Sequence, residues 1–189
     1  MGIIHRDVCV ENMMYYLDVE GNIIGVLEDY DSATLRAEQH NGQAFLKQKT
    51  GTRPYMAKEL LECAEPPAHL FRYDLESIMY SFLDLACYRH ASLEIQRASP
   101  IHEWFDQESS GKAIANSKAQ FLITPTIPVT TQGMEELTDV VSSLYDMFSA
   151  AHLYMGGALL VQLRTGKKFD LVTIDGHVTL DAFAAIFGT

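Results

Sequence analysis

Residues 3–12 read Ile-Ile-His-Arg-Asp-Val-Cys-Val-Glu-Asn, and the fold that we expect depends on this stretch. Two apolar residues precede His-Arg-Asp, and Asn12 follows Asp7 by five positions. A carboxyl group and an amide group five residues apart can both be presented by one short, rigid loop. The meaning of the stretch depends on the segments that follow it.

Three further segments follow in order along the chain. Residues 26–31 (Val-Leu-Glu-Asp-Tyr-Asp) place an acidic group at the end of an apolar run. Residues 51–59 read Gly-Thr-Arg-Pro-Tyr-Met-Ala-Lys-Glu, and residues 73–78 (Tyr-Asp-Leu-Glu-Ser-Ile) lie within a long apolar segment. This order and these separations are hard to obtain by accident.

The segments together resemble the eukaryotic-like protein kinases and, more narrowly, the fungal-type protein kinase family. Residues 3–12 resemble the catalytic loop, and residues 26–31 carry Asp-aromatic-Asp where kinases have Asp-Phe-Gly. Residues 51–59 resemble the close of the activation segment, with Ala-Lys-Glu for Ala-Pro-Glu. Residues 73–78 resemble the start of the central helix, and residues 176–183 are similar to that family's C-terminus.

The resemblance implies one domain over residues 1–189, a kinase C-terminal lobe that starts at the catalytic loop, with the N-lobe absent. The implied fold class is mainly α (α+β), with a short β-hairpin and a buried central helix. Residues 13–18 and 23–27 predict the hairpin, because two apolar runs flank a Gly-Asn turn. The nearly all-round apolar stripe of residues 70–88 predicts the central helix.

The other predicted elements are shorter or lie later in the chain. The polar, glycine-rich residues 31–55 predict a surface loop. Helices are expected at 56–63, around Trp104 to Leu122 on either side of a Ser-Ser-Gly break, at 134–154 with Gly156-Gly157 ending the last, and over the final ten residues.

Composition limits the classes of partner. With 48% apolar residues in 189, the chain can form a domain with its own core. Its formal charge of −11 (14 basic against 25 acidic residues) argues against nucleic acid or a membrane surface as partner. Cys9, Cys63 and Cys87 are widely spaced, which favours reduced thiols and an intracellular location, cytoplasmic or nuclear. No apolar run approaches membrane-spanning length.

By resemblance, Asp7 is the catalytic base, and Asn12 and Asp29 hold the Mg²⁺ that bridges ATP phosphates. The structural alternatives are a capping Asp7, a turn residue at Asn12 and a solvated acidic turn at Asp29. Met14 is implied in the floor under the adenine of ATP, and a plain core position in a strand is an equal alternative. ATP and Mg²⁺ are therefore the implied cofactors.

The resemblance also implies structural and regulatory roles. His5 and Tyr30 stack in the core beneath the site, and Asp74 caps the backbone amides of the catalytic loop; its alternative is an ordinary first-turn Asp. Asp31 replaces the usual Gly and adds a carboxylate. Thr52 accompanies Ser/Thr specificity, because its hydroxyl can bond the catalytic Asp.

Two expectations concern ion pairs. Arg6 offers a charge to a phosphorylated activation loop, with Thr50 or Thr34 as candidate acceptors and plain surface polarity as the alternative. The resemblance implies an Arg partner for Glu59, which the sequence does not identify; Arg164 is named as a candidate without a supporting pattern.

Two departures argue against full activity. Cys9 stands where most Ser/Thr kinases carry a Lys that contacts the transferring phosphoryl group, and a thiol supplies no positive charge. No Gly-x-Gly-x-x-Gly loop and no Val-Ala-Ile-Lys strand occur in the 189 residues. We therefore expect the isolated polypeptide to be weakly active or inactive.

Three readings remain open. The first is an ATP-dependent Ser/Thr protein kinase C-lobe acting on a protein substrate. The second is a non-catalytic, pseudokinase-like or regulatory interaction fragment, whose exposed N-lobe-facing surface would self-associate or bind a partner. The third is an unrelated metal-binding helical domain, which would explain the acidic cluster but not the ordered motifs.

Overall fold

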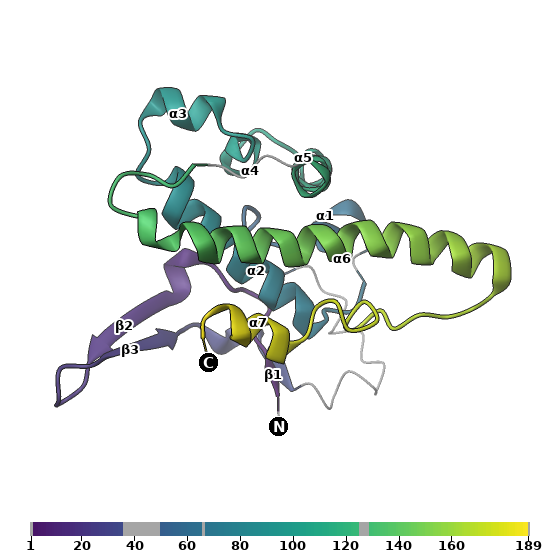
Figure 1. The fold of residues 1–189 in the computed structure, drawn as a ribbon, viewed down its shortest axis with the longest axis horizontal. Helices are drawn as coiled ribbons and strands as arrows, with labels where there is room; N and C mark the ends of the chain where they lie inside the picture. Colours follow the sequence, from purple (N-terminus) through teal and green to yellow (C-terminus); the bar gives the residue numbers. More distant parts are fainter. Residues whose placement is uncertain (1, 36–49, 66, 125–128, 189) are drawn as a thin grey trace.

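The computed structural model describes residues 2–35, 50–65, 67–124 and 129–188. The described chain is mainly helical with two small antiparallel sheets, as the predicted α+β class requires (Figure 1). The elements in chain order are β1 (Ile3–Ile4), η1 (Val10–Asn12), β2 (Met13–Leu17), β3 (Ile23–Leu27), η2 (Tyr30–Ser32), β4 (Thr34–Leu35), α1 (Lys58–Glu62), α2 (Phe71–Leu83), the π-helix η5 (Asp84–Tyr88), α3 (Leu93–Ala98), α4 (His102–Phe105), α5 (Gly111–Ile123), η6 (Glu135–Leu137), α6 (Thr138–Thr165) and α7 (Leu180–Ile186).

The predicted β-hairpin is confirmed. Strands β2 and β3 pair antiparallel with Leu17 opposite Ile23, and the hairpin projects from the helical body (Figure 1). The Asp18 carboxylate closes the turn by accepting the backbone N–H groups of Glu20 and Asn22, each at 2.8 Å. The turn joins β2 to β3, and the strands stay paired along their length. Met13 and Leu27 therefore lie opposite each other at the other end of the hairpin.

The surface loop predicted over residues 31–55 is only partly right. Residues 36–49 lie outside the described residues, but Thr34 and Leu35 form strand β4. This strand pairs antiparallel with β1, with Ile4 opposite Thr34. The polar composition concealed the strand because it spans only two residues.

Helix α2 is the buried central helix that the sequence predicts. Tyr73, Met79, Tyr80 and Leu83 are at most 1% exposed, and α6 packs across the helix (Figure 1). The predicted helical range of 70–88 also holds, because the π-helix η5 continues α2 to Tyr88. Most of the apolar core therefore gathers around one helix.

The shorter helices follow their capping residues. Helix α5 begins after Ser110, whose side chain accepts the N–H of Ala113 at 3.2 Å, so the predicted Ser-Ser-Gly break is confirmed. Helix α7 begins after Thr179, which caps the N–H of Ala182 at 3.1 Å, and confirms the helical tail. Across the described ranges, no helix is both long and apolar enough to cross a bilayer.

The predicted end of the long helix is wrong. Helix α6 runs for 28 residues, through Gly156 and Gly157, and ends at Thr165, just before Gly166. Gly166 has φ of 72° and donates its N–H to Gln162 O at 2.8 Å, which is a left-handed C-terminal cap. Glycine lowers helix stability without forbidding the helix, so the pair at 156–157 did not stop it. The second half of α6 carries exposed apolar side chains such as Leu163.

Candidate functional site

The loop after β1 is anchored from the central helix. Asp74, in the first turn of α2, accepts the backbone N–H of His5 at 2.6 Å and that of Arg6 at 3.0 Å. Its Oδ1 also lies 3.0 Å from Nε2 of His69. Arg6 has φ of 72°, so the loop turns sharply there and the two amides point toward α2. The contact predicted for Asp74 is therefore present.

Asp7 is held by one of its two carboxylate oxygens. The backbone N–H and the hydroxyl of Thr52 both donate to Oδ1, at 2.8 and 2.9 Å. Among the described residues, none donates a hydrogen bond to Oδ2 of Asp7. Asn12 donates its side-chain NH₂ to the backbone carbonyl of Asp7 at 2.9 Å, so its amide oxygen is turned away from this bond. The loop thus presents one carboxylate oxygen and one amide oxygen.

The hairpin brings Asp29 back to Asn12. The backbone carbonyl of Asn12 accepts the N–H of Glu28 at 2.9 Å, directly before Asp29. Asp29 is exposed and adopts a left-handed backbone with φ of 61°, which is uncommon for a residue with a side chain. Asn12 and Asp29 therefore lie at the same end of the hairpin, as its predicted geometry requires.

His5 and Tyr30 differ from the expectation in part. Their rings meet edge to face at 4.7 Å, and Nε2 of His5 lies 2.8 Å from Glu28 O, so the predicted contact exists. His5 is buried, but Tyr30 is 51% exposed and does not belong to the core. Tyr30 opens the exposed turn η2, and Asp31 beside it is exposed too.

Arg6 is enclosed rather than available at the surface. Its side chain is 2% exposed and Nη1 donates to Ser32 O at 3.3 Å. Burial lowers the pKa of Arg6, and the charge of Asp74 opposes this shift. Thr34 is 5% exposed, and the Thr50 hydroxyl is buried as well. A phosphate could reach Thr34 only after the β1–β4 pair opened.

Cys9 lies within the site without a charge of its own. The side chain is 2% exposed, and burial raises the pKa of the thiol. Met14, two residues beyond Asn12, is 52% exposed on the first strand of the hairpin. The alternative reading of Met14 as a core position is wrong, because this strand has no buried residue.

Glu59 pairs with Arg72, and the predicted partner Arg164 is wrong. Nη1 and Nη2 of Arg72 bind the two carboxylate oxygens of Glu59 at 3.0 and 2.6 Å, and the Tyr73 hydroxyl donates to the same carboxylate at 2.7 Å. Nε of Arg72 donates to Leu171 O at 2.9 Å. Arg164 is exposed in the last turn of α6.

Lys118 is a site residue that the sequence analysis missed. It is fully buried, and its Nζ donates to the carbonyls of Pro54 at 2.7 Å and Met56 at 2.6 Å. Nζ also lies 3.7 Å from the centre of the Tyr80 ring. Burial lowers the pKa of Lys118, and the negative charge of Glu76 opposes the shift. Position 118 follows 114 and 115 on the buried stripe of α5, which was the available signal.

A second missed residue, Arg89, links the loop after β1 to the end of the central helix. Its Nη2 binds Glu11 at 2.7 Å, and its Nε donates to the buried carboxylate of Asp84 at 2.8 Å. Tyr55 donates to the same Asp84 oxygen at 2.8 Å. Burial alone would lower the pKa of Arg89, but these two acidic partners raise it.

The comparison with protein families covers the first part of the chain. Residues 1–86 match the model of a family described as fungal protein kinase. No curated protein and no solved structure matches the chain. The family match runs from β1 through α2, so it includes Asp7, Asn12, Asp29 and Asp74. It does not reach residues 176–183, whose similarity to the family stays a prediction.

Proposed function

From the match of residues 1–86 to the fungal protein kinase model, we propose that the chain is a member of this family and serves ATP-dependent phosphoryl transfer to a Ser or Thr hydroxyl of a protein substrate. The observation that carries the proposal is the asymmetric anchoring of Asp7. Thr52 holds Oδ1 through two donors, while Oδ2 receives no hydrogen bond from a described residue. A carboxylate fixed in this way has one oxygen ready for a substrate.

Asp7 would act on the attacking hydroxyl. Its Oδ2 accepts the hydroxyl hydrogen, orients the oxygen toward the phosphoryl group and takes the proton as the new bond forms. The Thr52 hydroxyl, 2.9 Å from Oδ1, keeps the carboxylate from rotating away. This pairing also supports the preference for Ser and Thr over Tyr that the family resemblance implies.

Asn12 and Asp29 would hold Mg²⁺. Both offer oxygen ligands, which this cation prefers, and both are partly or fully exposed, so water and phosphate oxygens can complete the coordination. The described residues contain no cluster of three or more His, Cys, Asp or Glu side chains that could hold a metal alone. When bound, Mg²⁺ would neutralise charge on the ATP phosphates. Met14, exposed on the same hairpin, would lie under the adenine.

The 189-residue polypeptide alone should bind Mg·ATP weakly and transfer phosphate negligibly. The neutral Cys9 cannot supply the positive charge that phosphoryl transfer uses. The hairpin offers one exposed wall for a nucleotide, since Tyr15, Leu17 and Ile23 are all more than 60% exposed. Phosphoryl transfer depends mainly on positioning and charge neutralisation, and one wall provides little of either.

The metal site is tested with Mn²⁺ as a paramagnetic probe in nuclear magnetic resonance. Mn²⁺ should broaden the amide signals of Asn12 and Asp29 first, because its relaxation effect falls steeply with distance. Asp29→Asn should weaken Mn²⁺ binding by about tenfold, equivalent to the ~1.4 kcal/mol that one charged ligand contributes. The matched control is Asp139→Asn, which removes an equally exposed carboxylate from the first turn of α6.

Equal broadening at exposed carboxylates throughout the chain, or equal effects of the two substitutions, would contradict the metal site. Adding ATP extends the test. A thermal-shift titration with Mg·ATP should show no saturation at micromolar concentration. Saturable micromolar binding would show that the exposed wall already holds the nucleotide, and the proposal of weak binding would be wrong.

A second candidate function is a non-catalytic interaction fragment, and the hairpin surface favours it. Seven of the ten residues of β2 and β3 are exposed, although the strands are apolar. Such a surface favours association with another copy or with a partner. We expect oligomers in size-exclusion chromatography, and Ile23→Lys should shift them toward monomer. Leu93→Lys on α3 is the control, because Leu93 is 70% and Ile23 72% exposed. A monomeric unsubstituted chain would contradict the association.

A further inference from the structure

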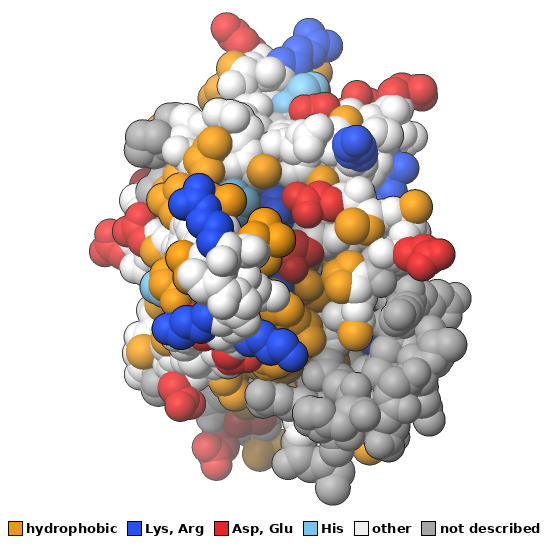
Figure 2. Space-filling view, turned by 90° about the vertical axis from the view of Figure 1, so that its right-hand side faces the viewer, with side chains coloured by type: hydrophobic (Ala, Val, Ile, Leu, Met, Phe, Trp, Pro, Cys, Tyr) orange, Lys and Arg blue, Asp and Glu red, His pale blue; other side chains and the backbone are white. Residues whose placement is uncertain are grey.

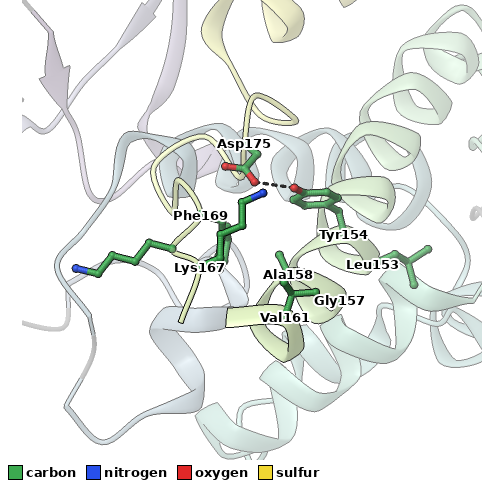
Figure 3. A pocket seen from close by; sticks show the side chains of 9 residues that line it. Leu153, Tyr154, Gly157, Ala158, Val161, Lys167, Phe169 and Asp175 are labelled. Atoms are coloured by element: carbon green, nitrogen blue, oxygen red, sulfur yellow. Dashed lines mark hydrogen bonds between the residues drawn. The ribbon is translucent and has the colours of Figure 1, made fainter. Parts of the chain in front are cut away.

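A pocket lies far from Asp7 along the chain, between the second half of α6 and residues 167–175 (Figure 3). Its volume is about 450 Å³, which falls within the usual range for small-molecule sites. Ala158 and Val161 line it from the helix, and Phe169 lines it from the opposite segment. These two facing walls carry apolar side chains, and both belong to segments that the structure describes.

Gly157 keeps the helix side of this pocket open. Glycine is among the poorest helix formers, so its place within the 28-residue α6 calls for a reason. Close packing is not that reason, because nothing lies within 4 Å of a Cβ built on Gly157. Any side chain at this position would instead project into the pocket that Gly157 lines. Gly156 has equally open surroundings but does not line the pocket.

The other end of the pocket is polar and carries positive charge. Tyr154 donates its hydroxyl to Asp175 at 2.6 Å, and its ring packs on His177 with centroids 4.3 Å apart. Lys167 reaches toward this pair in Figure 3, and its charge helps to lower the pKa of Asp175, after the hydrogen bond from Tyr154. Lys168 also lines the pocket.

The pocket is richer in positive charge than the chain as a whole. Two lysines and one aspartate line it, and the charge of Asp170 also acts on Asp175, whereas the whole chain has a formal charge of −11. Figure 2 views the side on which α6 ends and shows basic side chains among hydrophobic ones there. Among the described residues, neither Lys167 nor Lys168 forms an ion pair within 4.0 Å, so their ammonium groups can bind an anion.

We propose that this pocket binds a small organic anion with a flat, apolar body, such as an aromatic carboxylate. The carboxylate would pair with Lys167 or Lys168 at the mouth. The apolar body would lie between Phe169 and the helix surface left bare by Gly157. The proposal is independent of phosphoryl transfer, because none of these residues belongs to the catalytic loop.

The test uses 2-naphthoate as the probe, with 2-naphthamide as its neutral counterpart of the same shape. Isothermal titration should detect binding of 2-naphthoate to the full chain. Gly157→Leu should weaken this binding by at least about tenfold, the effect expected when apolar groups fill a pocket of this kind. Gly156→Leu is the matched control, because it gives the helix the same gain in propensity and leaves the pocket empty.

Charge gives a second measurement that does not depend on how Gly157→Leu folds. Lys167→Gln should weaken 2-naphthoate binding by roughly two- to fivefold, as expected for one partly exposed ion pair. Lys112→Gln, which removes a charge at the start of α5, should leave binding unchanged. The proposal fails if 2-naphthoate does not bind, if the amide binds as well as the acid, or if both glycine substitutions act alike.

Discussion

Asp74→Ala should lower the free energy of unfolding by about 3–5 kcal/mol, because it leaves buried donors without an acceptor. The carboxylate is 5% exposed and accepts the backbone N–H groups of His5 and Arg6, and it also contacts the His69 ring. Each unsatisfied buried donor costs about 1–3 kcal/mol. His5, Arg6 and Asp74 are all buried, so water has little access to replace the lost acceptor.

The measurement is chemical denaturation combined with amide hydrogen exchange. The amides of His5 and Arg6 should lose protection far beyond the average for the chain, since their acceptor is gone. Asp74→Asn should fall between the native chain and Asp74→Ala, because one carbonyl acceptor remains.

Asp139→Ala separates this role from a general helix effect. Asp74 and Asp139 both lie in the first turn of their helices, so the negative charge of each interacts favourably with the helix dipole. Only Asp74 is buried under the loop of residues 5–7, whereas Asp139 is exposed. If the dipole were the whole explanation, both substitutions would cost about 0.3–1 kcal/mol. Equal losses would therefore contradict the anchoring role of Asp74.

The contacts that the sequence predicted are those made by short, patterned segments. The hairpin is visible in residues 13–27 because strand periodicity and a turn are both local. The Asp74 and Thr52 contacts were predicted from the resemblance, because residues that match a family motif are expected to adopt the arrangement that the family shows. Residues 1–86, where those motifs lie, are also the part with a family match.

The missed features depend on side-chain environment rather than on pattern. Lys118 is a charged residue on a buried stripe, and its two carbonyl acceptors come from a loop more than 60 residues away. The end of α6 was misplaced because Gly156 and Gly157 lie inside a helix whose other residues outweigh their low propensity. The exposure of Tyr30 depends on which segments pack against its ring, and a local sequence pattern does not predict those tertiary neighbours.

The partner of Glu59 shows the same limit. Composition alone does not single out a partner, because the chain has seven arginines. Arg72 is the partner because it lies in the first turn of α2, 13 residues after Glu59, and its side chain reaches Glu59 on α1. Its hydrogen bond to Leu171 O also ties the C-terminal segment to the two helices. One side chain thus joins three parts of the chain, and its removal should affect all three.

Glu59→Ala should cost about 3–5 kcal/mol, since it leaves the nearly buried charge of Arg72 without its partner. The Arg72 side chain is 4% and that of Glu59 19% exposed, and two parallel hydrogen bonds join them. Glu62→Ala is the control on the same helix. It breaks the single-bond pair with Lys58, in which Glu62 is 41% and Lys58 8% exposed, and it should cost less because water reaches the Glu62 side of this pair.

Acid unfolding adds a signed test of the same pair. Burial would raise the pKa of Glu59, but the hydrogen bonds and charge of Arg72 outweigh it and hold the pKa below its ordinary value. A carboxyl with a lowered folded-state pKa contributes stability above the unfolded pKa of about 4.3 and loses it as pH falls through the folded value. Glu59→Gln should therefore flatten the fall in unfolding free energy below about pH 4.3.

The double variant Glu59→Leu with Arg72→Met tests whether the ion pair stabilises the fold. The alternative is that Glu59→Ala destabilises it only because the buried charge of Arg72 loses its partner. Replacing both charges with apolar groups of similar size is often neutral or stabilising, while breaking the pair is not. We expect the double variant to recover most of the loss caused by Glu59→Ala in denaturation experiments. It should not restore the hydrogen bond to Leu171 O, so residues 171–174 should still exchange faster than in the native chain. A double variant as unstable as Glu59→Ala would show that the loss comes from the C-terminal segment and not from an unpaired charge.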